Sequence, residues 1–344
     1  MSTVLTVILG LFILTILVVA HETGHFLVGR ACDIRINEFS VGFGPRLFSK
    51  EKKGIRYSVR ALPVGGYVLF YGEDQEVDAT YEPRAFNNRP IWKRFVTLLA
   101  GPFMNIVLAF LITVIVLTVF GDYVPTIRSV EAGMPAYEVG LQAGDRIVMV
   151  NDKKVDFSME FEMASEDFST SETVELGVER AGKYLEFSVP LAQDAEGKMR
   201  MGISYDSATR YQFDFFEAIG LSFKWMYLII VQMLSFLGGL IFRGQGMSSV
   251  AGPVGTITLM GQAMRSGPEV ALRMAALLSI NLGIMNILPF PALDGGRIVF
   301  LGIEKLRGKP ISREKEGYIN LAGLVLLFLL MILLTYQDIS RLLA

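Results

Sequence analysis

Histidine, cysteine and net charge are the scarce features of this chain, and each scarcity narrows what the chain can be. A single cysteine, Cys32, cannot form an intramolecular disulfide framework. A net charge of −2 gives no sign of a nucleic-acid partner, and we expect none. Only two histidines are present, so any site that needs this side chain is restricted to those two positions.

Hydrophobic residues are correspondingly abundant. They make up 52% of the 344 residues without counting the 34 glycines, and the mean hydropathy is +0.45. Soluble domains reach about 45–50% only when glycine is included. The excess gathers in uncharged runs, and a helix of about 20 apolar residues can cross a bilayer. We predict four spanning helices from Met1–Ala20, Phe95–Gly121, Met274–Leu293 and Gly317–Gln337.

Basic residues predict the orientation of these helices, because cytoplasmic loops carry an excess of Lys and Arg. Arg30–Arg94 holds 12 Lys or Arg and Arg297–Glu316 holds six, so both are predicted to be cytoplasmic. Gly121–Phe216 holds nine Lys or Arg against 18 Asp or Glu, which predicts an extracytoplasmic location. Both termini are then extracytoplasmic. The first run lacks a basic flank and a small-residue cleavage site, which disfavours a signal peptide.

One further apolar segment, Trp225–Phe242, does not fit four crossings. If it crossed once, every later element would invert, and Arg297–Glu316 would lie outside against the charge rule. We predict that Phe216–Phe242 is a helix that lies in or dips into the outer leaflet. The alternative is a true crossing that returns through Met247–Met264.

The extracytoplasmic stretch has the pattern of one small α+β domain. Ile127–Val130 and Arg146–Val150 have strand character, two alternating segments flank Arg180-Ala-Gly182 as a hairpin, and Ser158–Asp167 has helical character. The string Gly140-Leu-Gln-Ala-Gly-Asp-Arg-Ile147, in this order of elements, resembles a PDZ domain. PDZ domains bind extended peptide ends by strand addition. The alternative is a spacer that excludes bulky substrates and binds nothing.

The two histidines follow the first hydrophobic run, in His21-Glu22-Thr23-Gly24-His25. Helix positions four residues apart lie about 40° apart around the axis, so both imidazoles can reach one metal ion. Glu22 lies beside them as a candidate general base, which is the arrangement of a His-Glu-x-x-His zinc site. A carboxylate within or beside an apolar membrane helix is costly and calls for a function. A polar patch at a helix end is the alternative, and it does not account for the spacing.

A catalytic zinc site needs a third protein ligand and an open position. With no other histidine and one cysteine, a carboxylate is expected, and Asp294 is the best candidate. It ends the third run in Asn286-Ile-Leu-Pro-Phe-Pro-Ala-Leu-Asp294-Gly-Gly296, where prolines and glycines break the helix. An even number of crossings between the second and third runs brings Asp294 to the membrane depth of the histidines. The alternative is a helix-end residue in water or paired with Arg297.

These motifs resemble the site-2 proteases, the intramembrane zinc metalloproteases of peptidase family M50, and in particular the bacterial regulator-of-sigma-E type. The resemblance implies that His21, His25 and Asp294 bind Zn²⁺, and that Glu22 activates water. It also implies that Asn286 and Pro289 of the late motif hold substrate. The resemblance extends over nearly the whole chain and includes Val41-Gly-Phe-Gly-Pro45, Leu62-Pro-Val-Gly-Gly-Tyr67, Gly101-Pro-Phe-Met-Asn105 and Gly252-Pro-Val-Gly255.

A substrate helix must unwind before it can be cut, because its carbonyls are hydrogen-bonded within the helix. The segment Gly54–Tyr71 alternates polar and apolar residues, and we predict that it folds as a hairpin. The resemblance places this hairpin in the membrane near the site. Its free edge, around Gly65, Gly66 and Tyr67, is predicted to hold the unwound substrate as an added strand. The alternative is a simple cytoplasmic hairpin.

The predicted function is that of a zinc metalloendopeptidase that cuts transmembrane segments of single-span proteins. The resemblance implies substrates such as trimmed anti-sigma factors and remnant signal peptides, and a multi-pass location in the bacterial inner membrane. The predicted partners are these substrates, the lipid bilayer and, at the PDZ-like domain, peptide C-termini. A metal transporter would need further intramembrane carboxylates or histidines, which the four runs lack. An idle scaffold would not need an intact His-Glu-x-x-His and Asp294.

The predicted fold is a polytopic α-helical membrane protein with four spanning helices, a membrane-associated β-hairpin and one inserted extracytoplasmic α+β PDZ-like domain. Its predicted parts are a first transmembrane helix (1–30), a cytoplasmic-side loop with the hairpin (31–90), a second transmembrane helix (91–121), the PDZ-like domain (125–205), an outer-leaflet amphipathic or re-entrant region (206–270), a third transmembrane helix with the Leu-Asp-Gly motif (271–303) and a fourth (317–341).

Overall fold

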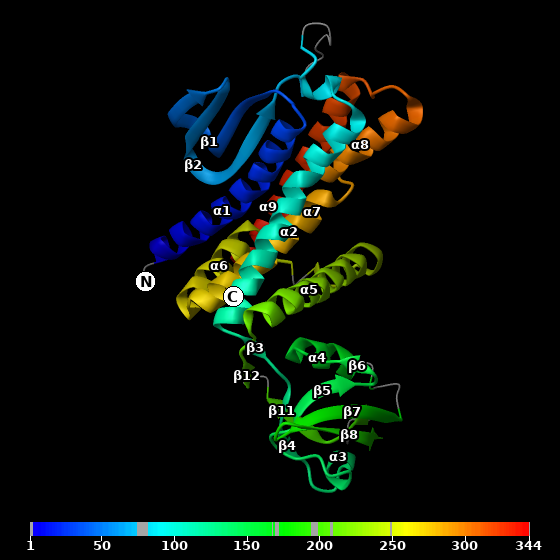
Figure 1. Ribbon diagram of the computed structural model, residues 1–344. Helices are drawn as coiled ribbons and strands as arrows, with labels where there is room; N and C mark the ends of the chain where they lie inside the picture. Colours follow the sequence, from blue (N-terminus) through cyan, green and yellow to red (C-terminus); the bar gives the residue numbers. More distant parts are fainter. Residues whose placement is uncertain are drawn as a thin grey trace. The chain divides into compact units, whose positions relative to one another are not determined.

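The computed structural model describes residues 3–73, 82–166, 168, 172–193, 199–206, 209–247 and 250–343. The chain divides into two compact units, one made of residues 1–113 and 223–344 and the other of residues 114–222. The first consists mainly of long helices and the second mainly of short strands (Figure 1). The first unit contains α1 (Thr3–Ala31), β1 (Ile36–Lys52), β2 (Ile55–Phe70), a 3₁₀ turn at Phe86–Asn88, α2 (Ile91–Val119), α5 (Phe215–Arg243), α6 (Pro253–Ser266), α7 (Pro268–Ile287), α8 (Asp294–Arg307) and α9 (Arg313–Leu343), with α2 and α5 extending into the second.

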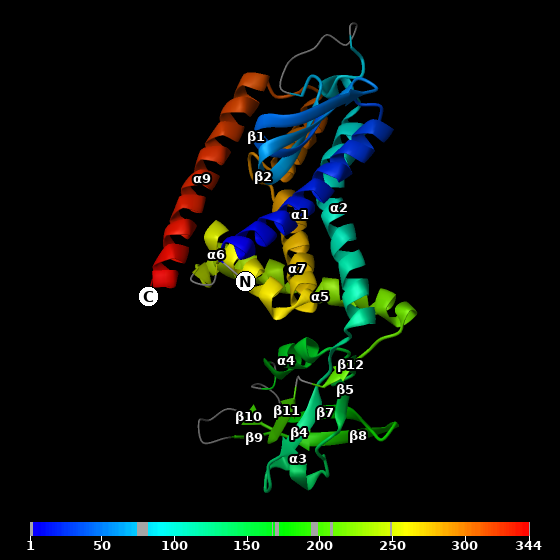
Figure 2. The ribbon, with the colours of Figure 1, turned by 90° about the vertical axis from the view of Figure 1, so that its left-hand side faces the viewer.

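Five described helices are long and apolar enough to cross a membrane, as judged by length and composition alone. Four of them, α1, α2, α7 and α9, correspond to the four predicted spans. The fifth is α5, which covers the segment predicted to lie in the outer leaflet. Figure 2 shows residues 223–243 of α5 running across, and not along, the direction of α2, α7 and α9. Length and composition therefore allow one more span than the sequence prediction counts.

The predicted third transmembrane segment, residues 271–303, is divided between two helices. α7 ends at Ile287 and α8 begins at Asp294. Leu288 has an extended backbone with ψ of 141°, because a residue that precedes proline is disfavoured in the helical conformation. The break that the prolines and glycines predict is therefore present, and it makes Asp294 the first residue of a new helix.

The predicted hairpin at Gly54–Tyr71 needs a correction. This segment is not a hairpin by itself; it forms one arm, β2, which pairs antiparallel with β1. Lys53 and Gly54 make the turn with φ of 54° and 73°, the left-handed pair that favours a two-residue hairpin loop. The β1 arm is hard to recognise as a strand from its sequence, because its internal glycines and proline are residues typical of turns.

The hairpin curls so that its second arm supplies an outer edge. Residues 38–41 of β1 pair with residues 66–69 of β2 on one side and with residues 56–59 on the other. Among the described residues, no further strand pairs with the outer side of residues 66–70. This edge is therefore free to accept backbone hydrogen bonds from another chain.

A buried ion pair holds the curled hairpin together. Glu38 is 4% exposed and accepts hydrogen bonds from Ser58 Oγ at 2.5 Å and from the Arg60 guanidinium at 2.9 Å. Arg60 also donates to Gly44 O at 2.8 Å and to the Tyr67 hydroxyl. Burial raises the pKa of Glu38, but these hydrogen bonds outweigh it and hold the pKa below its ordinary value. Glu38 therefore stays ionised and paired.

The second unit is built on a six-stranded antiparallel sheet in the order β11-β4-β5-β7-β8, with β6 beside β5. The predicted strands at Ile127–Val130 and Arg146–Val150 are confirmed as β4 and β5, and the predicted hairpin is β7-β8. The predicted helix is α4, and Asp167 at its end lies outside the described residues. Its elements are β3 (Asp122–Tyr123), β4 (Thr126–Val130), α3 (Pro135–Glu138), β5 (Arg146–Val150), β6 (Lys153–Lys154), α4 (Ser158–Glu166), β7 (Thr173–Arg180), β8 (Lys183–Pro190), β9 (Ala192–Gln193), β10 (Met199–Arg200), β11 (Ile203–Asp206) and β12 (Arg210–Tyr211).

The core of the second unit lies where the sheet strands bury their alternating apolar side chains. Ile127, Ile147, Val174 and Val178 are at most 1% exposed. Asp145, at the end of the Gly-Leu-x-x-Gly-Asp string, is also fully buried and accepts two hydrogen bonds of 2.6 Å from the guanidinium of Arg180 on β7. This string therefore attaches the turn before β5 to the neighbouring strand.

Candidate active site

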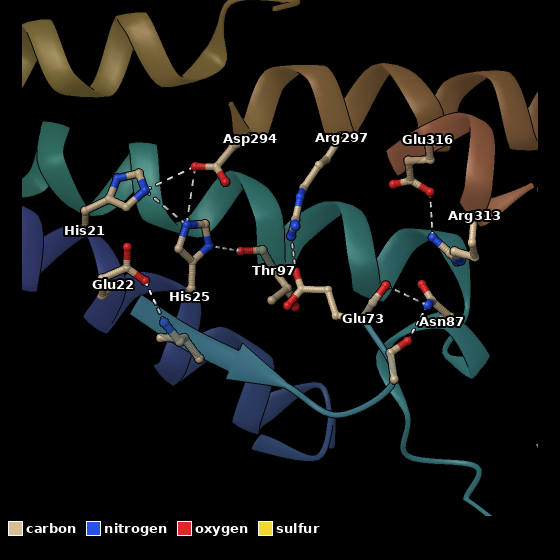
Figure 3. A network of polar contacts seen from close by, with 12 residues as sticks. His21, Glu22, His25, Glu73, Asn87, Thr97, Asp294, Arg297, Arg313 and Glu316 are labelled. Carbon is tan, nitrogen blue, oxygen red and sulfur yellow. Dashed lines mark hydrogen bonds and ion pairs between the residues drawn. The ribbon is translucent and has the colours of Figure 1, made fainter. Parts of the chain in front are cut away.

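Three side chains from two distant parts of the first unit converge on one point (Figure 3). His21 and His25 lie one helical turn apart on α1, and Asp294 begins α8. Asp294 Oδ2 lies 3.1 Å from His21 Nε2 and 3.3 Å from His25 Nε2, and the two Nε2 atoms are 3.1 Å apart. Both histidines are buried, at 7% and 6% exposure. The structure thus brings together the three residues that the sequence selects.

The orientation of His25 is set by a backbone carbonyl. Its Nδ1 lies 2.8 Å from Thr97 O on α2. A carbonyl oxygen only accepts, so Nδ1 carries the hydrogen and donates it. In the neutral ring Nε2 then holds a lone pair, and this lone pair faces Asp294 and His21. A metal-bound histidine typically donates a hydrogen bond of this kind from the ring nitrogen that does not bind the metal.

The residues fit a zinc ion. Asp294 Oδ2 is buried, and among the described residues no donor hydrogen-bonds to it. Two imidazole nitrogens and one carboxylate oxygen lie 3.1–3.3 Å from one another, so a single cation between them could bind all three. With bonds of about 2.0–2.1 Å, two ligand atoms of a tetrahedral zinc site lie about 3.3–3.4 Å apart, close to the observed spacing. Two imidazoles and one carboxylate are also a donor set found in catalytic zinc sites.

Glu22 is adjacent to this cluster on α1 but is held by the hairpin. Its Oε2 accepts a hydrogen bond of 3.0 Å from the backbone N–H of Val68, on the free edge of β2 (Figure 3). Glu22, the two histidines and Asp294 all line one cavity of about 470 Å³. The candidate base, the candidate metal ligands and the strand edge therefore share one open space.

The predicted substrate-binding residues divide into two groups. Asn286 and Tyr67 line the cavity. Gly66 is next to it, because a Cβ at this position would lie 3.6 Å from Glu22 Cγ. Gly65 instead packs against Phe43, and Pro289 is exposed outside the cavity lining.

The sequence profile of Peptidase family M50 matches residues 9–330. The chain belongs to peptidase family M50. A Clostridium acetobutylicum protein named as a zinc metalloprotease is 32% identical over 97% of this chain and 97% of its own length. The Regulator of sigma-W protease RasP of Bacillus subtilis is 31% identical over 98% of this chain and 99% of its own.

Among solved structures, the PDZ domain of the SdrC-like protein from Listeria innocua is 26% identical to a part of this M50 peptidase. The alignment covers 27% of this chain and 100% of that domain, with a TM-score of 0.23. Membership of the family makes the chain a zinc metalloprotease, and its apolar helices make it a multi-pass membrane protein.

Asp294 of this M50 peptidase is positioned by the loop before it. A Cβ at Gly295 would lie 2.1 Å from Leu288 O, and a Cβ at Gly296 would lie 2.3 Å from Phe290 O. The two glycines therefore let the loop fold back against the start of α8. Ala292 in this loop has a left-handed φ of 71°, and its N–H donates to Asn320 Oδ1 on α9 at 3.2 Å.

The alternative partner for Asp294 is occupied elsewhere. Arg297 forms an ion pair with Glu73, which follows β2 (Figure 3). The ion-pair contacts of Asp294 among the described residues are those to His21 and His25. The Arg297–Glu73 pair also ties the start of α8 to the segment after the hairpin.

Sequence reasoning missed the part of the site that α2 supplies. Besides Thr97, Nδ2 of the buried Asn105 side chain lies 3.3 Å from His21 Nδ1. Gly24, between the two histidines, packs so closely on α2 that a Cβ would lie 2.2 Å from Ala100 O. The Gly101-Pro-Phe-Met-Asn105 string was the available signal, since glycine and proline inside an apolar helix call for a reason.

Proposed function

We propose that His21, His25 and Asp294 hold the catalytic zinc ion and that Glu22 is the general base of an intramembrane endopeptidase. The observation that carries this proposal is the meeting of three potential ligand atoms, two imidazole nitrogens and one carboxylate oxygen, within 3.1–3.3 Å of one another, beside Glu22, at one cavity. The proposed substrates are transmembrane segments of single-span proteins.

The proposed reaction is hydrolysis of a peptide bond that has been unwound in the cavity. A zinc ion at this site supplies Lewis-acid activation of water and of the scissile carbonyl. Glu22 takes the proton from the attacking water and passes it to the leaving amide nitrogen, so the same carboxyl serves first as base and then as acid. Burial of the two histidines beneath α2 keeps their rings fixed while this occurs.

The edge of β2 is proposed to hold the substrate. Support comes from the N–H of Val68, which points away from β1 toward the cavity, and from the absence of another paired strand among the described residues. A substrate strand on this edge would place its backbone beside Glu22. Gly66 and Tyr67 belong to that edge, and Asn286 faces the same cavity.

The substrate class is proposed to be membrane proteins already shortened outside the membrane, such as trimmed anti-sigma factors and remnant signal peptides. The name of the B. subtilis relative connects that protein to sigma-W regulation. A cavity of about 470 Å³ beside a strand edge suits a short unwound segment and not a folded protein. We place the enzyme in the bacterial inner membrane, with both termini and the second unit extracytoplasmic.

We further propose that residues 125–205 act as a PDZ-like module that takes peptide C-termini along β11. β11 pairs with β4 on one side, and no described strand pairs with its other side. Phe161 of α4 packs on Tyr205 of β11 with ring centroids 4.8 Å apart, which sets a helix beside this edge. A helix beside a free strand edge is the arrangement that strand addition uses.

The test of the catalytic assignment compares Glu22→Gln with His21→Ala in the purified full-length enzyme. Glu22→Gln removes the base but no ligand, so its zinc content should stay at the wild-type level while cleavage of a single-span reporter falls about 10²–10⁴-fold. His21→Ala should lose both zinc and cleavage. Zinc is measured by elemental analysis, and cleavage in lipid vesicles.

Glu314→Gln is the matched control, because Glu314 is exposed in the first turn of α9. It should match the wild type in both measurements. Wild-type turnover by Glu22→Gln would remove Glu22 from the mechanism, and full zinc content in His21→Ala would remove His21 from the ligand set.

A further inference from the structure

One face of α2 supports both histidines. Thr97, Gly101 and Asn105 are four residues apart, so they follow one another along the same side of the helix. The first supplies the carbonyl for His25 Nδ1, the second leaves room for the rings, and the third reaches His21 Nδ1. The outer nitrogens of both rings therefore meet groups from a single helix.

Asn105 is an unusual residue at this place in the protein. It is 0% exposed, and its side-chain oxygen Oδ1 has no hydrogen-bond partner among the described residues. Its backbone oxygen accepts the Ser279 hydroxyl of α7 at 2.8 Å, which fixes the helix at this point. A buried amide with an unsatisfied oxygen is costly in an apolar helix pair, so packing alone does not account for asparagine here.

The two ends of an asparagine amide are interchangeable by a rotation of 180°, and their assignment follows the hydrogen-bond network. In the structure Asn105 Nδ2 is the atom that faces His21 Nδ1; in this orientation Asn105 would donate to Nδ1 and the ring hydrogen would sit on Nε2, the atom that faces Asp294. With Oδ1 toward His21, the amide oxygen accepts the Nδ1 hydrogen, and Nε2 keeps its lone pair. The second arrangement is reached by turning the amide through 180°, which gives Oδ1 a partner and moves the NH₂ group to the place that Oδ1 has in the structure.

We propose that Asn105 is a positioning residue that accepts the Nδ1–H of His21 and so holds His21 Nε2 ready to bind zinc. This inference rests on the proposed function, in which His21 is a ligand. Thr97 O does the same for His25. The orientations of both rings are therefore fixed by α2, through the backbone carbonyl of Thr97 and the side-chain carbonyl of Asn105. Such outer partners of metal-bound histidine change metal affinity when they are removed.

The test uses two substitutions of nearly the same volume. Asn105→Leu removes the acceptor and should weaken zinc binding about 10–100-fold. Asn105→Asp keeps an acceptor and has no donor, so it should bind zinc within a few-fold of the wild type. Affinity is measured on the purified full-length protein by competition with a chelator. Equal losses in both variants would show that Asn105 donates and would overturn the proposal, as would wild-type affinity in Asn105→Leu.

Controls separate this proposal from folding and from the ligand assignment. Thr113→Val changes another buried polar residue of α2, whose hydroxyl donates to Ala109 O in its own helix, and it should leave zinc affinity unchanged. Thermal unfolding of the zinc-free variants reports folding, and Asn105→Ala replaces the leucine variant if that one does not fold. Loss of zinc in His21→Ala with full affinity in both Asn105→Leu and Asn105→Ala would refute the role of Asn105 alone, whereas zinc retained by His21→Ala would refute the ligand assignment itself.

Discussion

A single glycine decides whether the histidines have room to converge. At Gly101 a Cβ atom would lie 2.2 Å from His25 Nε2 and 2.7 Å from His21 Nε2. Contacts below 3.0 Å do not occur for real Cβ atoms, so an added methyl group would have to displace both rings. The metal-binding capacity of α1 therefore depends on a residue of α2 that contributes no ligand.

We expect Gly101→Ala to lose zinc and protease activity although alanine favours helices. The methyl group would push the Nε2 atoms away from Asp294, and zinc content should fall to the level of His21→Ala. Gly302→Ala is the control, because a Cβ at this helical position has nothing within 4 Å. It should keep full zinc content and gain up to about 1 kcal/mol in stability from helix propensity. Elemental analysis and thermal unfolding measure the two effects, and a zinc-loaded Gly101→Ala would contradict the steric argument.

The contrast between predicted and missed residues has a physical basis. His21 and His25 were predictable because four-residue spacing on a helix is a local property. Asp294 followed from counting the remaining ligand types in an apolar chain. Gly101 and Asn105 depend on which face of α2 meets α1, and no periodicity within either helix specifies that contact.

At the scale of elements, successive backbone N–H groups of β2 point to opposite sides of the strand, one set toward β1 and the other away from it. Tyr71 donates its N–H to Arg35 O on the β1 side, whereas Val68, an odd number of positions away, donates to Glu22 on the opposite side. Gly66, Val68 and Phe70 therefore present their backbone groups to the side away from β1, and Tyr67 and Leu69 present theirs to β1. Proline substitutions can remove one set without the other.

Val68→Pro should impair cleavage while the hairpin stays folded. It deletes only the N–H that faces the cavity, and proline is tolerated on the free side of an edge strand. We expect a loss of at least about 10-fold in kcat/KM for a single-span reporter, since both a substrate hydrogen bond and the contact to Glu22 disappear. Val68→Ala keeps the N–H and should cleave at nearly the wild-type rate. Unchanged kinetics in the proline variant would count against substrate binding on this edge.

The elements differed in how well their sequences specified them. The strands β4, β5, β7 and β8 of the second unit lie where the pattern places them, and Ala181-Gly182 forms the predicted turn between β7 and β8. The β1 arm carries glycines and a proline because it curls, with φ of 84° at Gly42 and 83° at Gly44. These residues let the strand bend and do not form a loop. The sequence alone does not distinguish the two cases, because the difference lies in the pairing of β1 with β2.

At the scale of the whole molecule, the direction of α7 restricts the path of the chain through the membrane. The Ser279 hydroxyl donates to Asn105 O, and a Cβ at Gly283 would lie 3.1 Å from Pro102 O. Contacts that advance along α7 thus move backward along α2, so the two helices pack antiparallel. α2 begins near the histidines and α7 ends near them. The chain therefore leaves α2 and enters α7 on the same far side, which requires an even number of crossings between them.

Among the described residues of the first unit, α5 and α6 are the helices between α2 and α7. α6 has 14 residues, about 21 Å at 1.5 Å per residue, and is shorter than the hydrocarbon thickness of about 30 Å. It cannot complete a pair of helical crossings with α5. We infer that α5 does not cross, although its length and composition would allow it, and that it lies along the extracytoplasmic face.

Cysteine labelling tests this path. Thr209 precedes α5, Gln245 follows it, and Lys309 lies in the turn between α8 and α9, all three exposed. In a Cys32→Ala background, single cysteines at 209 and 245 should react in intact cells with a maleimide that cannot cross the membrane, because both ends of α5 face outside. A cysteine at 309 should react only after permeabilisation. If the cysteine at 245 needs permeabilisation while that at 209 does not, α5 crosses the membrane, and either α7 must then be reached by a non-helical return or the antiparallel packing of α2 and α7 is incorrect.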